Sequence, residues 1–128
     1  DGNAACAELG IGGVEGNIRV VENTAEIHNL VVCTLCSCYP WPLLGLPPIW
    51  YKSFPYRARA VAEPRAVLSE FGVELADDVR VRVWDSSSEV RYFVLPARPD
   101  GTDDRSEEQL AAIVDRNSMI GTGVVTAP

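Results

Sequence analysis

Three of the chain's four cysteines lie within six residues, in the run Cys33-Thr34-Leu35-Cys36-Ser37-Cys38. Sulfur atoms this close along a chain can converge on one point, and soft thiolate ligands favour a transition metal at that point. A disulfide is the poorer interpretation, because such near neighbours rarely meet disulfide geometry and an odd cysteine would be left over. The spacing therefore predicts a metal site built from Cys33, Cys36 and Cys38.

The backbone around Ser37 could add further ligands to this site. Because Ser37 stands between two thiolates, the amide nitrogens of Ser37 and Cys38 are drawn toward the same centre. Three sulfurs and up to two nitrogens leave a coordination position open, and an open position distinguishes a catalytic metal site from a structural one. Cys6 could instead complete a four-thiolate zinc or iron–sulfur site, and otherwise it is expected to be a buried small hydrophobe.

The run from Val32 to Cys38 resembles the metal-binding claw of the nitrile hydratase alpha subunit in its cobalt form, whereas the iron form usually has serine in place of Thr34. The similarity continues through Trp41-Pro42, Leu44 to Pro48, Trp50 to Ser53, Tyr56 to Arg59, Glu63 to Arg65, Arg91-Tyr92 and Ile120-Gly121. It covers nearly the whole chain, and it favours a catalytic claw over a zinc or iron–sulfur site.

The resemblance implies a chemistry for the claw. It implies a low-spin Co(III) ion, with Fe(III) as the alternative, held by Cys33, Cys36, Ser37 and Cys38. Nitrile would be hydrated to amide, with Cys36 and Cys38 as catalytic residues oxidised to sulfinic and sulfenic acid and Cys33 left as a thiolate. Trp41 would line the substrate pocket.

The resemblance also implies partners. Oxidised sulfurs are anions, and in the family the cations beside them are arginines of a separate beta subunit. We therefore expect a beta subunit, a cobalt-delivery or activator protein and a small-molecule nitrile. Arg91, Asp85 and Glu89 match family positions that support the site or the subunit contact.

Two alternative functions remain open at this point. The metal-binding subunit of thiocyanate hydrolase shares the claw, although the residues after Tyr39 fit nitrile hydratase better. A non-enzymatic zinc or redox cysteine module is an alternative of another class, and it predicts unmodified cysteines.

The chain departs from the family near its N-terminus. Glu15-Gly16 stands where the family commonly has glutamine before glycine, and a carboxylate there would repel oxidised sulfurs. The helical N-terminal arm that family members usually carry is absent, so we expect a truncated or processed N-terminus.

Length and composition bound the remaining possibilities. The 128 residues, 47% of them hydrophobic, suit one domain spanning 1–128 with a core that needs no disulfides. A net charge of -7 argues against nucleic acid or an anionic membrane as a partner. No run is long enough to span a membrane or resembles a signal peptide, and reduced cysteines suit the cytoplasm.

The elements that must position the claw are predicted from periodicity and turn chemistry. Strands are predicted at 17–22, 27–32, 79–84, 90–96 and 117–125. Helices are predicted at 56–62, 65–71 and 107–115. The strand at 27–32 runs directly into Cys33, and the strand at 90–96 is expected to return beside 79–84 as a hairpin. Five prolines between Pro40 and Pro55 should prevent a long helix and keep the backbone extended. The sequence thus predicts an α+β fold, and the resemblance specifies the layered α/β fold of nitrile hydratase alpha subunits.

Other polar residues are weaker candidates for a functional site. His28 is the single histidine, and strand alternation predicts a surface or edge position for it. Arg57, Arg59 and Arg65 form a basic cluster that is solvated, makes a subunit contact or supports the claw. The paired acidic residues fall in turns or at a helix N-terminus, where no acid–base pair is expected.

Overall fold

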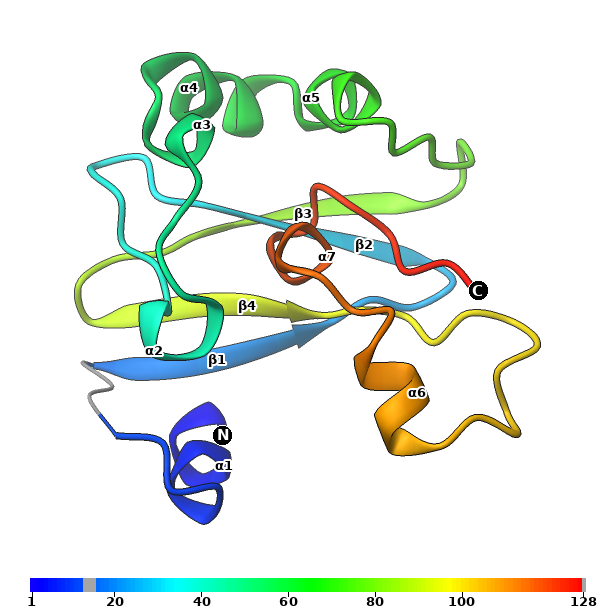
Figure 1. Cartoon of the computed structure of the whole chain (residues 1–128). Helices are drawn as coiled ribbons and strands as arrows, with labels where there is room; N and C mark the ends of the chain where they lie inside the picture. Colours follow the sequence, from blue (N-terminus) through cyan, green and yellow to red (C-terminus); the bar gives the residue numbers. More distant parts are fainter. Residues whose placement is uncertain (13–15, 128) are drawn as a thin grey trace.

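The computed structural model describes residues 1–12 and 16–127. Within these ranges the chain alternates short helices with four strands (Figure 1). In chain order the elements are α1 (Gly2–Glu8), β1 (Asn17–Glu22), β2 (Ile27–Val32), α2 (Trp41–Leu44), α3 (Ile49–Lys52), α4 (Phe54–Ala62), α5 (Pro64–Glu70), β3 (Arg80–Asp85), β4 (Val90–Leu95), α6 (Glu107–Ala111) and α7 (Arg116–Ile120). This mixture confirms the predicted α+β class.

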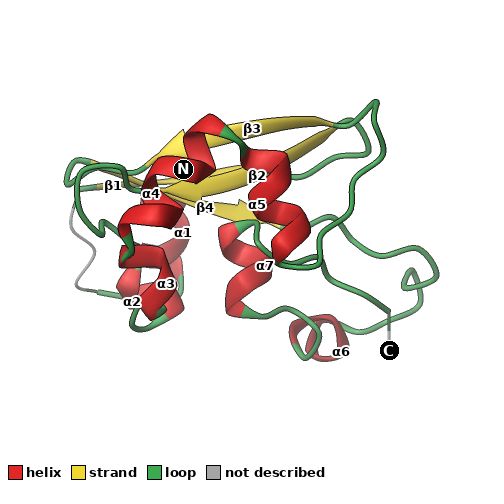
Figure 2. Ribbon diagram, turned by 90° about the horizontal axis from the view of Figure 1, so that it is seen from above, coloured by secondary structure: helices red, strands yellow, loops and turns green. Residues whose placement is uncertain are grey.

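The strands form two parallel pairs. β1 pairs with β4, so that Asn17 lies opposite Val90, and β2 pairs with β3, so that Val32 lies opposite Asp85. Helices α4 and α5 cover the β2–β3 pair, α1 packs on β1, and α7 contacts both β2 and β4 (Figures 1 and 2). The result is a layered arrangement of helices and two strand pairs, with β2 enclosed near its centre.

The predicted hairpin between β3 and β4 is wrong. Each strand directs its backbone hydrogen bonds to another partner, because β3 is paired with β2 and β4 with β1. The Ser86 amide donates to the carbonyl of Val32 at 2.7 Å, and the Asn17 amide donates to the carbonyl of Glu89 at 2.7 Å. Parallel strands need a long crossover connection. The connection from β2 to β3 is the stretch that contains the cysteines and α2 to α5.

The proline-rich stretch forms short helices rather than extended backbone. No long helix forms among residues 40–53, as predicted, but α2 and α3 each make a single turn. Pro40 and Pro48 precede these turns, and Pro55 lies in the first turn of α4, where a missing N–H costs nothing. The Ser53 side chain caps α4 by accepting from the Tyr56 amide. The prolines therefore start helices instead of excluding them.

The C-terminal elements differ from the prediction in two ways. The capping box of Ser106 and Gln109 begins α6 as expected, but the helix ends at Ala111 rather than at residue 115. The strand predicted at 117–125 is wrong, because Asp115 and Ser118 form a second capping box that starts α7. Gly121 ends α7 in the left-handed region with φ of 102°.

The hydrophobic core lies between β2 and the helices above it. Its fully buried members include Leu30, Tyr51, Ala60 and Leu68, with Ile120 closing it from α7. In the described part of the chain, no helix has the length and apolar character needed to cross a membrane. The core thus holds β2 in place on both faces, and β2 leads directly into the cysteine run.

Candidate metal centre

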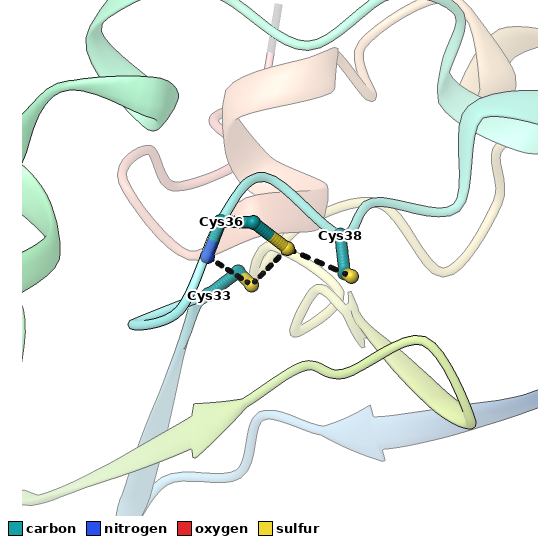
Figure 3. A group of neighbouring side chains, drawn as sticks. All are labelled: Cys33, Cys36 and Cys38. Carbon is teal, nitrogen blue, oxygen red and sulfur yellow. Dashed lines mark hydrogen bonds between the residues drawn. The ribbon is translucent and has the colours of Figure 1, made fainter.

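The cysteine run leaves the C-terminal end of β2 as a loop. Cys33 is fully buried at the strand end, Cys36 is exposed, and Cys38 is partly buried. Figure 3 shows the three sulfur atoms turned toward one another from this one loop. The structure therefore brings together the three residues that the sequence predicted.

The sulfur spacing fits a shared metal ion. The Sγ atoms of Cys33 and Cys36 are 3.5 Å apart, and those of Cys36 and Cys38 are 3.3 Å apart. Two sulfurs bound at about 2.3 Å and at right angles to one ion would lie about 3.3 Å apart, whereas a disulfide needs about 2.05 Å. Among the described residues, Cys33, Cys36 and Cys38 are the group of potential metal ligands whose ligand atoms lie close together. Cys6 in α1 does not belong to this group. A four-thiolate site with Cys6 is therefore not formed.

The pKa values of Cys36 and Cys38 are shifted in opposite directions. Hydrogen bonds from Cys38 and then Cys33 lower the pKa of Cys36, and the backbone amides of Ser37 and Cys38 lower it further. Burial raises the pKa of Cys38 to about 12, and the neighbouring thiols add to that rise. The cluster thus favours the thiolate form at Cys36 over Cys38. A metal cation would replace the shared protons, since cysteine binds metal as thiolate.

The start of the loop is held at Thr34. The Asp85 carboxylate at the end of β3 accepts from the Thr34 amide at 2.9 Å and from its hydroxyl at 2.6 Å. Arg57 in α4 donates to the carbonyl of Thr34 at 3.1 Å, while its guanidinium lies 4.9 Å from the ring centroid of Phe54. One of the three clustered arginines therefore supports the claw.

The end of the loop is held by two further residues. The hydroxyl of Tyr51 donates to the carbonyl of Cys38 at 2.8 Å. Burial raises the pKa of Tyr51 well above its usual range, so the hydroxyl stays protonated as a donor. Arg91 in β4 donates to the carbonyl of Tyr39 at 3.4 Å.

A pocket of about 350 Å³ opens beside the two outer cysteines. Cys36, Ser37 and Cys38 contribute to its lining. The side chains that complete its lining are Tyr39, Trp41, Leu46, Pro47, Lys52 and Arg91. Trp41 is half exposed on α2 and is one of these lining residues, and its contact with a substrate stays a prediction. Lys52 was not singled out in the sequence, because a lone exposed lysine carries no spacing signal.

The other predicted residues are spread more widely. Glu89 is exposed in the turn after β3 and contacts the chain through its backbone. Glu15 lies outside the described residues. Arg59 pairs with Glu63 and Glu70, and Arg65 binds the carbonyl of Val79, so neither reaches the cysteines.

His28 is buried, contrary to the prediction of a surface position. Its Nε2 donates to the carbonyl of Gly121 at 2.7 Å, so Nδ1 is the acceptor that faces the Asn23 amide at 3.4 Å. Strand alternation failed because β2 is buried on both of its faces. Tyr51 was also missed as a site residue, since its spacing resembles that of any core aromatic.

Residues 1–123 match the family model of the nitrile hydratase alpha chain. The chain is 60% identical over 129 residues to the low-molecular-weight cobalt-containing nitrile hydratase subunit alpha of Rhodococcus rhodochrous, covering 100% of this chain and 62% of that protein. It is 52% identical over 108 residues to thiocyanate hydrolase subunit gamma of Thiobacillus thioparus, covering 84% of this chain and 44% of that protein.

The fold resembles a solved structure at similar coverage. A double mutant of the Fe-type nitrile hydratase from Comamonas testosteroni Ni1 superposes with a TM-score of 0.94 and 43% sequence identity, covering 100% of this chain and 63% of that one. The chain thus spans about 62% of the length of its cobalt-containing relative.

Proposed function

The chain belongs to the nitrile hydratase alpha-chain family, and from this premise we propose that it is the metal-binding alpha subunit of a cobalt nitrile hydratase. The complex would hydrate a nitrile to the corresponding amide. The observation that carries the proposal is the convergence of three thiols, two of which, those of Cys36 and Cys38, line an open pocket. Residues 1–128 would act as one catalytic domain.

The ligand set suits trivalent cobalt. Three thiolates are supplemented by the amides of Ser37 and Cys38, which already act on the Cys36 sulfur. Cobalt is favoured by the cobalt-containing relative at 60% identity and by the threonine at position 34. Iron is the alternative, since an Fe-type enzyme shares the fold at 43% identity.

The exposure of the cysteines supports the proposed modifications. Oxidation follows thiolate character and access. Cys36 is exposed, Cys38 is partly buried, and Cys33 is fully buried. This order fits a sulfinic acid at Cys36, a sulfenic acid at Cys38 and an unmodified thiolate at Cys33.

Each residue of the pocket has a proposed part in the reaction. A bound trivalent metal would supply Lewis-acid chemistry toward the nitrile nitrogen or toward water. Trp41 and Leu46 would wall the nitrile's apolar part, because both stand over the same pocket as the cysteines. Lys52 and Arg91 would lower the cost of collecting negative charge on the sulfurs. Asp85 would keep the loop in register through Thr34, and Glu89 would serve the subunit contact.

A beta subunit would cover the surface around the pocket. Large apolar side chains of the cysteine loop and of the segments that follow it are strongly exposed, and such surface is typical of an interface. The exposed fractions are 81% for Leu35, 85% for Leu46, 91% for Ile49 and 78% for Phe54. An activator protein would deliver cobalt to the same exposed loop, and the free cysteines suit the reducing cytoplasm.

Thiocyanate hydrolysis is the second candidate function. The charged side chains that line the pocket in the described chain, Lys52 and Arg91, are both basic, although the protein carries a net charge of -7. Basic residues would favour an anion such as thiocyanate over a neutral nitrile. The 52% identity to thiocyanate hydrolase subunit gamma supports the same candidate.

The decisive experiment uses the chain co-expressed with its beta subunit and an activator protein. Metal analysis, mass spectrometry of the peptide bearing Cys36 and Cys38, and turnover of acrylonitrile and thiocyanate are measured on one preparation. We expect cobalt, oxidised Cys36 and Cys38, and amide formation from the nitrile. Turnover of thiocyanate alone would select the second candidate, and zinc with unmodified cysteines would contradict both.

A further inference from the structure

The claw loop is fixed at its two ends and open between them. Its first peptide is held by Asp85 through the Thr34 amide and hydroxyl. Its last carbonyl, that of Cys38, accepts the Tyr51 hydroxyl. Among the described residues, the hydrogen bonds of Cys36 stay within the loop, to the sulfurs of Cys33 and Cys38. The position of the Cys38 thiol therefore depends on what holds its backbone.

Tyr51 is built to hold that backbone rigidly. Its side chain has no exposed surface, and its ring packs edge-on against Tyr39 at 5.1 Å between centroids. Trp50 and Tyr56 contact it at 6.3 Å and 5.9 Å. A phenol fixed by rings on several sides has little freedom, so the atom that it binds is fixed as well. Cys38 itself is only partly buried and packs against the edge of the core that encloses Tyr51.

We propose that Tyr51 is a positioning residue of the metal centre, whose hydroxyl holds the Cys38 carbonyl so that the Cys38 thiol stays beside Cys36 before metal binds. The inference rests on the proposed function only in taking the cysteine claw as the metal site. Tyr51 lies thirteen residues after Cys38 in the sequence and is therefore outside the cysteine motif that it would position. Outer residues that orient metal ligands in this way typically change metal affinity about 10–100-fold when they are lost.

Tyr56 provides a matched control in the same aromatic cluster. Its hydroxyl also donates to a backbone carbonyl, that of Val31, at 2.7 Å, and its ring is also buried. Val31, however, lies within β2, which is held by its pairing with β3. The substitutions Tyr51→Phe and Tyr56→Phe therefore remove the same hydrogen bond from the same kind of environment, once at the claw and once in the strand.

The test measures Co²⁺ binding to the full metal-free chain under reducing conditions. Affinity is determined by competition with a chelator, the thiolate-to-cobalt charge-transfer absorption is recorded, and urea unfolding of each metal-free variant is followed. We expect similar decreases of the unfolding midpoint for the two variants. We expect Tyr51→Phe alone to bind Co²⁺ about tenfold more weakly and to shift the charge-transfer band.

The alternative outcomes are distinct. Equal Co²⁺ affinity and an unchanged band in Tyr51→Phe would overturn the positioning role while leaving the metal site intact. Equal losses of affinity in both variants would reduce Tyr51 to a structural residue and overturn it too. Failure of the unsubstituted chain to bind Co²⁺ would overturn the metal site itself, and the positioning role with it.

Discussion

Strand β2 has a polar cluster at each of its ends, and the two clusters are satisfied by different means. Before and within the first half of the strand lie Asn23, His28 and Asn29, each at most 8% exposed. The Asn23 side-chain oxygen accepts from the backbone and side-chain amides of Asn29 at 2.8 Å and 3.0 Å. Trp84 on the neighbouring strand donates to the Asn29 side chain at 2.8 Å. We call these residues, together with Gly121, the asparagine–histidine network.

The claw at the other end of β2 has no such closure. Its three sulfurs face one another; burial and then the neighbouring thiols raise the pKa of Cys38, whereas hydrogen bonds from Cys38 and Cys33 lower that of Cys36. The network finds its hydrogen-bond partners within the chain, whereas the claw, under the proposed function, would be completed by a metal cation. Buried polar groups with internal partners contribute to folding, and ligands that await a metal contribute to binding. Substitutions in the claw should therefore weaken metal binding with little effect on stability, whereas substitutions in the network should lower stability.

Loss of a claw thiol should have the largest effect on metal binding and little effect on folding. Cys38→Ala removes the third sulfur. Loss of a residue that only orients a metal ligand weakens binding by up to about 100-fold, so we expect the Co²⁺ affinity of Cys38→Ala to fall by more than that. Unfolding of the metal-free chain by urea should change little, because Cys38 is only partly buried. Chelator competition and urea titration measure the two quantities on the same protein.

Cys6→Ala is the matched control for this prediction. Cys6 is 4% exposed in α1 and lies outside the sulfur cluster. We expect unchanged Co²⁺ affinity and a loss of about 1 kcal/mol of unfolding free energy, as for other small cuts in a core. Equal Co²⁺ binding by the two variants would mean that Cys38 is not a ligand.

Substitutions in the network should lower the unfolding free energy, and we expect the largest decrease at Gly121. Its carbonyl accepts from His28, its φ is 102°, and a Cβ atom there would lie 2.1 Å from the carbonyl oxygen of Asn29. We expect Gly121→Ala to cost about 4 kcal/mol of unfolding free energy, from left-handed strain and a clash with backbone that cannot yield. Gly101→Ala isolates the strain, since Gly101 has φ of 79° with nothing within 4 Å.

Comparison of the two glycine variants separates the cost of left-handed backbone strain from the cost of the steric clash. We expect Gly101→Ala to cost about 1 kcal/mol, because it carries strain alone. Similar losses in both variants, measured by urea unfolding of the metal-free chain, would show that the approach of α7 to β2 is not tight. Such a result would also weaken the role of Gly121 in fixing His28.

His28 gives the network a pH dependence of its own in metal-free unfolding. Burial lowers the pKa of His28, so the folded chain binds its proton less readily than the unfolded chain. The unfolded state then holds more protons below a pH of about 6.5, and stability falls as pH falls through that range, by up to about 1.4 kcal/mol per pH unit. Above that pH both states are neutral at this position, and the contribution is constant.

The measurement is the urea midpoint of the metal-free chain between pH 7.5 and about 5, a range around the unperturbed histidine pKa. His28→Gln keeps a side-chain donor for the Gly121 carbonyl but does not titrate, so the slope of its unfolding free energy should be shallower. Carboxylates titrate alike in both proteins and cancel in the difference. Parallel slopes would show that His28 takes up its proton without loss of the fold.

The two clusters also differ in how far the sequence predicted them. The claw was predicted residue by residue, because Cys33, Cys36 and Cys38 are local in sequence and their chemistry is specific. The network was missed, because its members come from 23, 28, 29, 84 and 121 and meet only after β2 is enclosed. Alternation in β2 predicts one solvated face, and only the tertiary layers show that both are covered.

The same distinction holds for the fold. The bounds of β1 and β2 were predicted correctly, since strand pattern and turn residues are local signals. Their partners were not, because β3 and β4 are separated by a short turn that suggests a hairpin but connects two different strand pairs. The Asp115–Ser118 capping box is a local signal that could have identified α7, and it was overlooked in favour of alternation after Asn117.

The smallest expected effect separates two candidate carboxylates at the claw. Asp85 binds the Thr34 amide and hydroxyl, whereas Glu89 is exposed and joins the chain through its backbone. Asp85→Asn replaces one acceptor oxygen by a donor, so we expect about tenfold weaker Co²⁺ binding, and Glu89→Gln should leave the affinity of the isolated chain unchanged. Chelator competition measures both variants. If Glu89→Gln weakened binding as much as Asp85→Asn, the charge of the turn would matter rather than the contact with Thr34, because both substitutions remove one negative charge and only one removes a hydrogen bond to the loop.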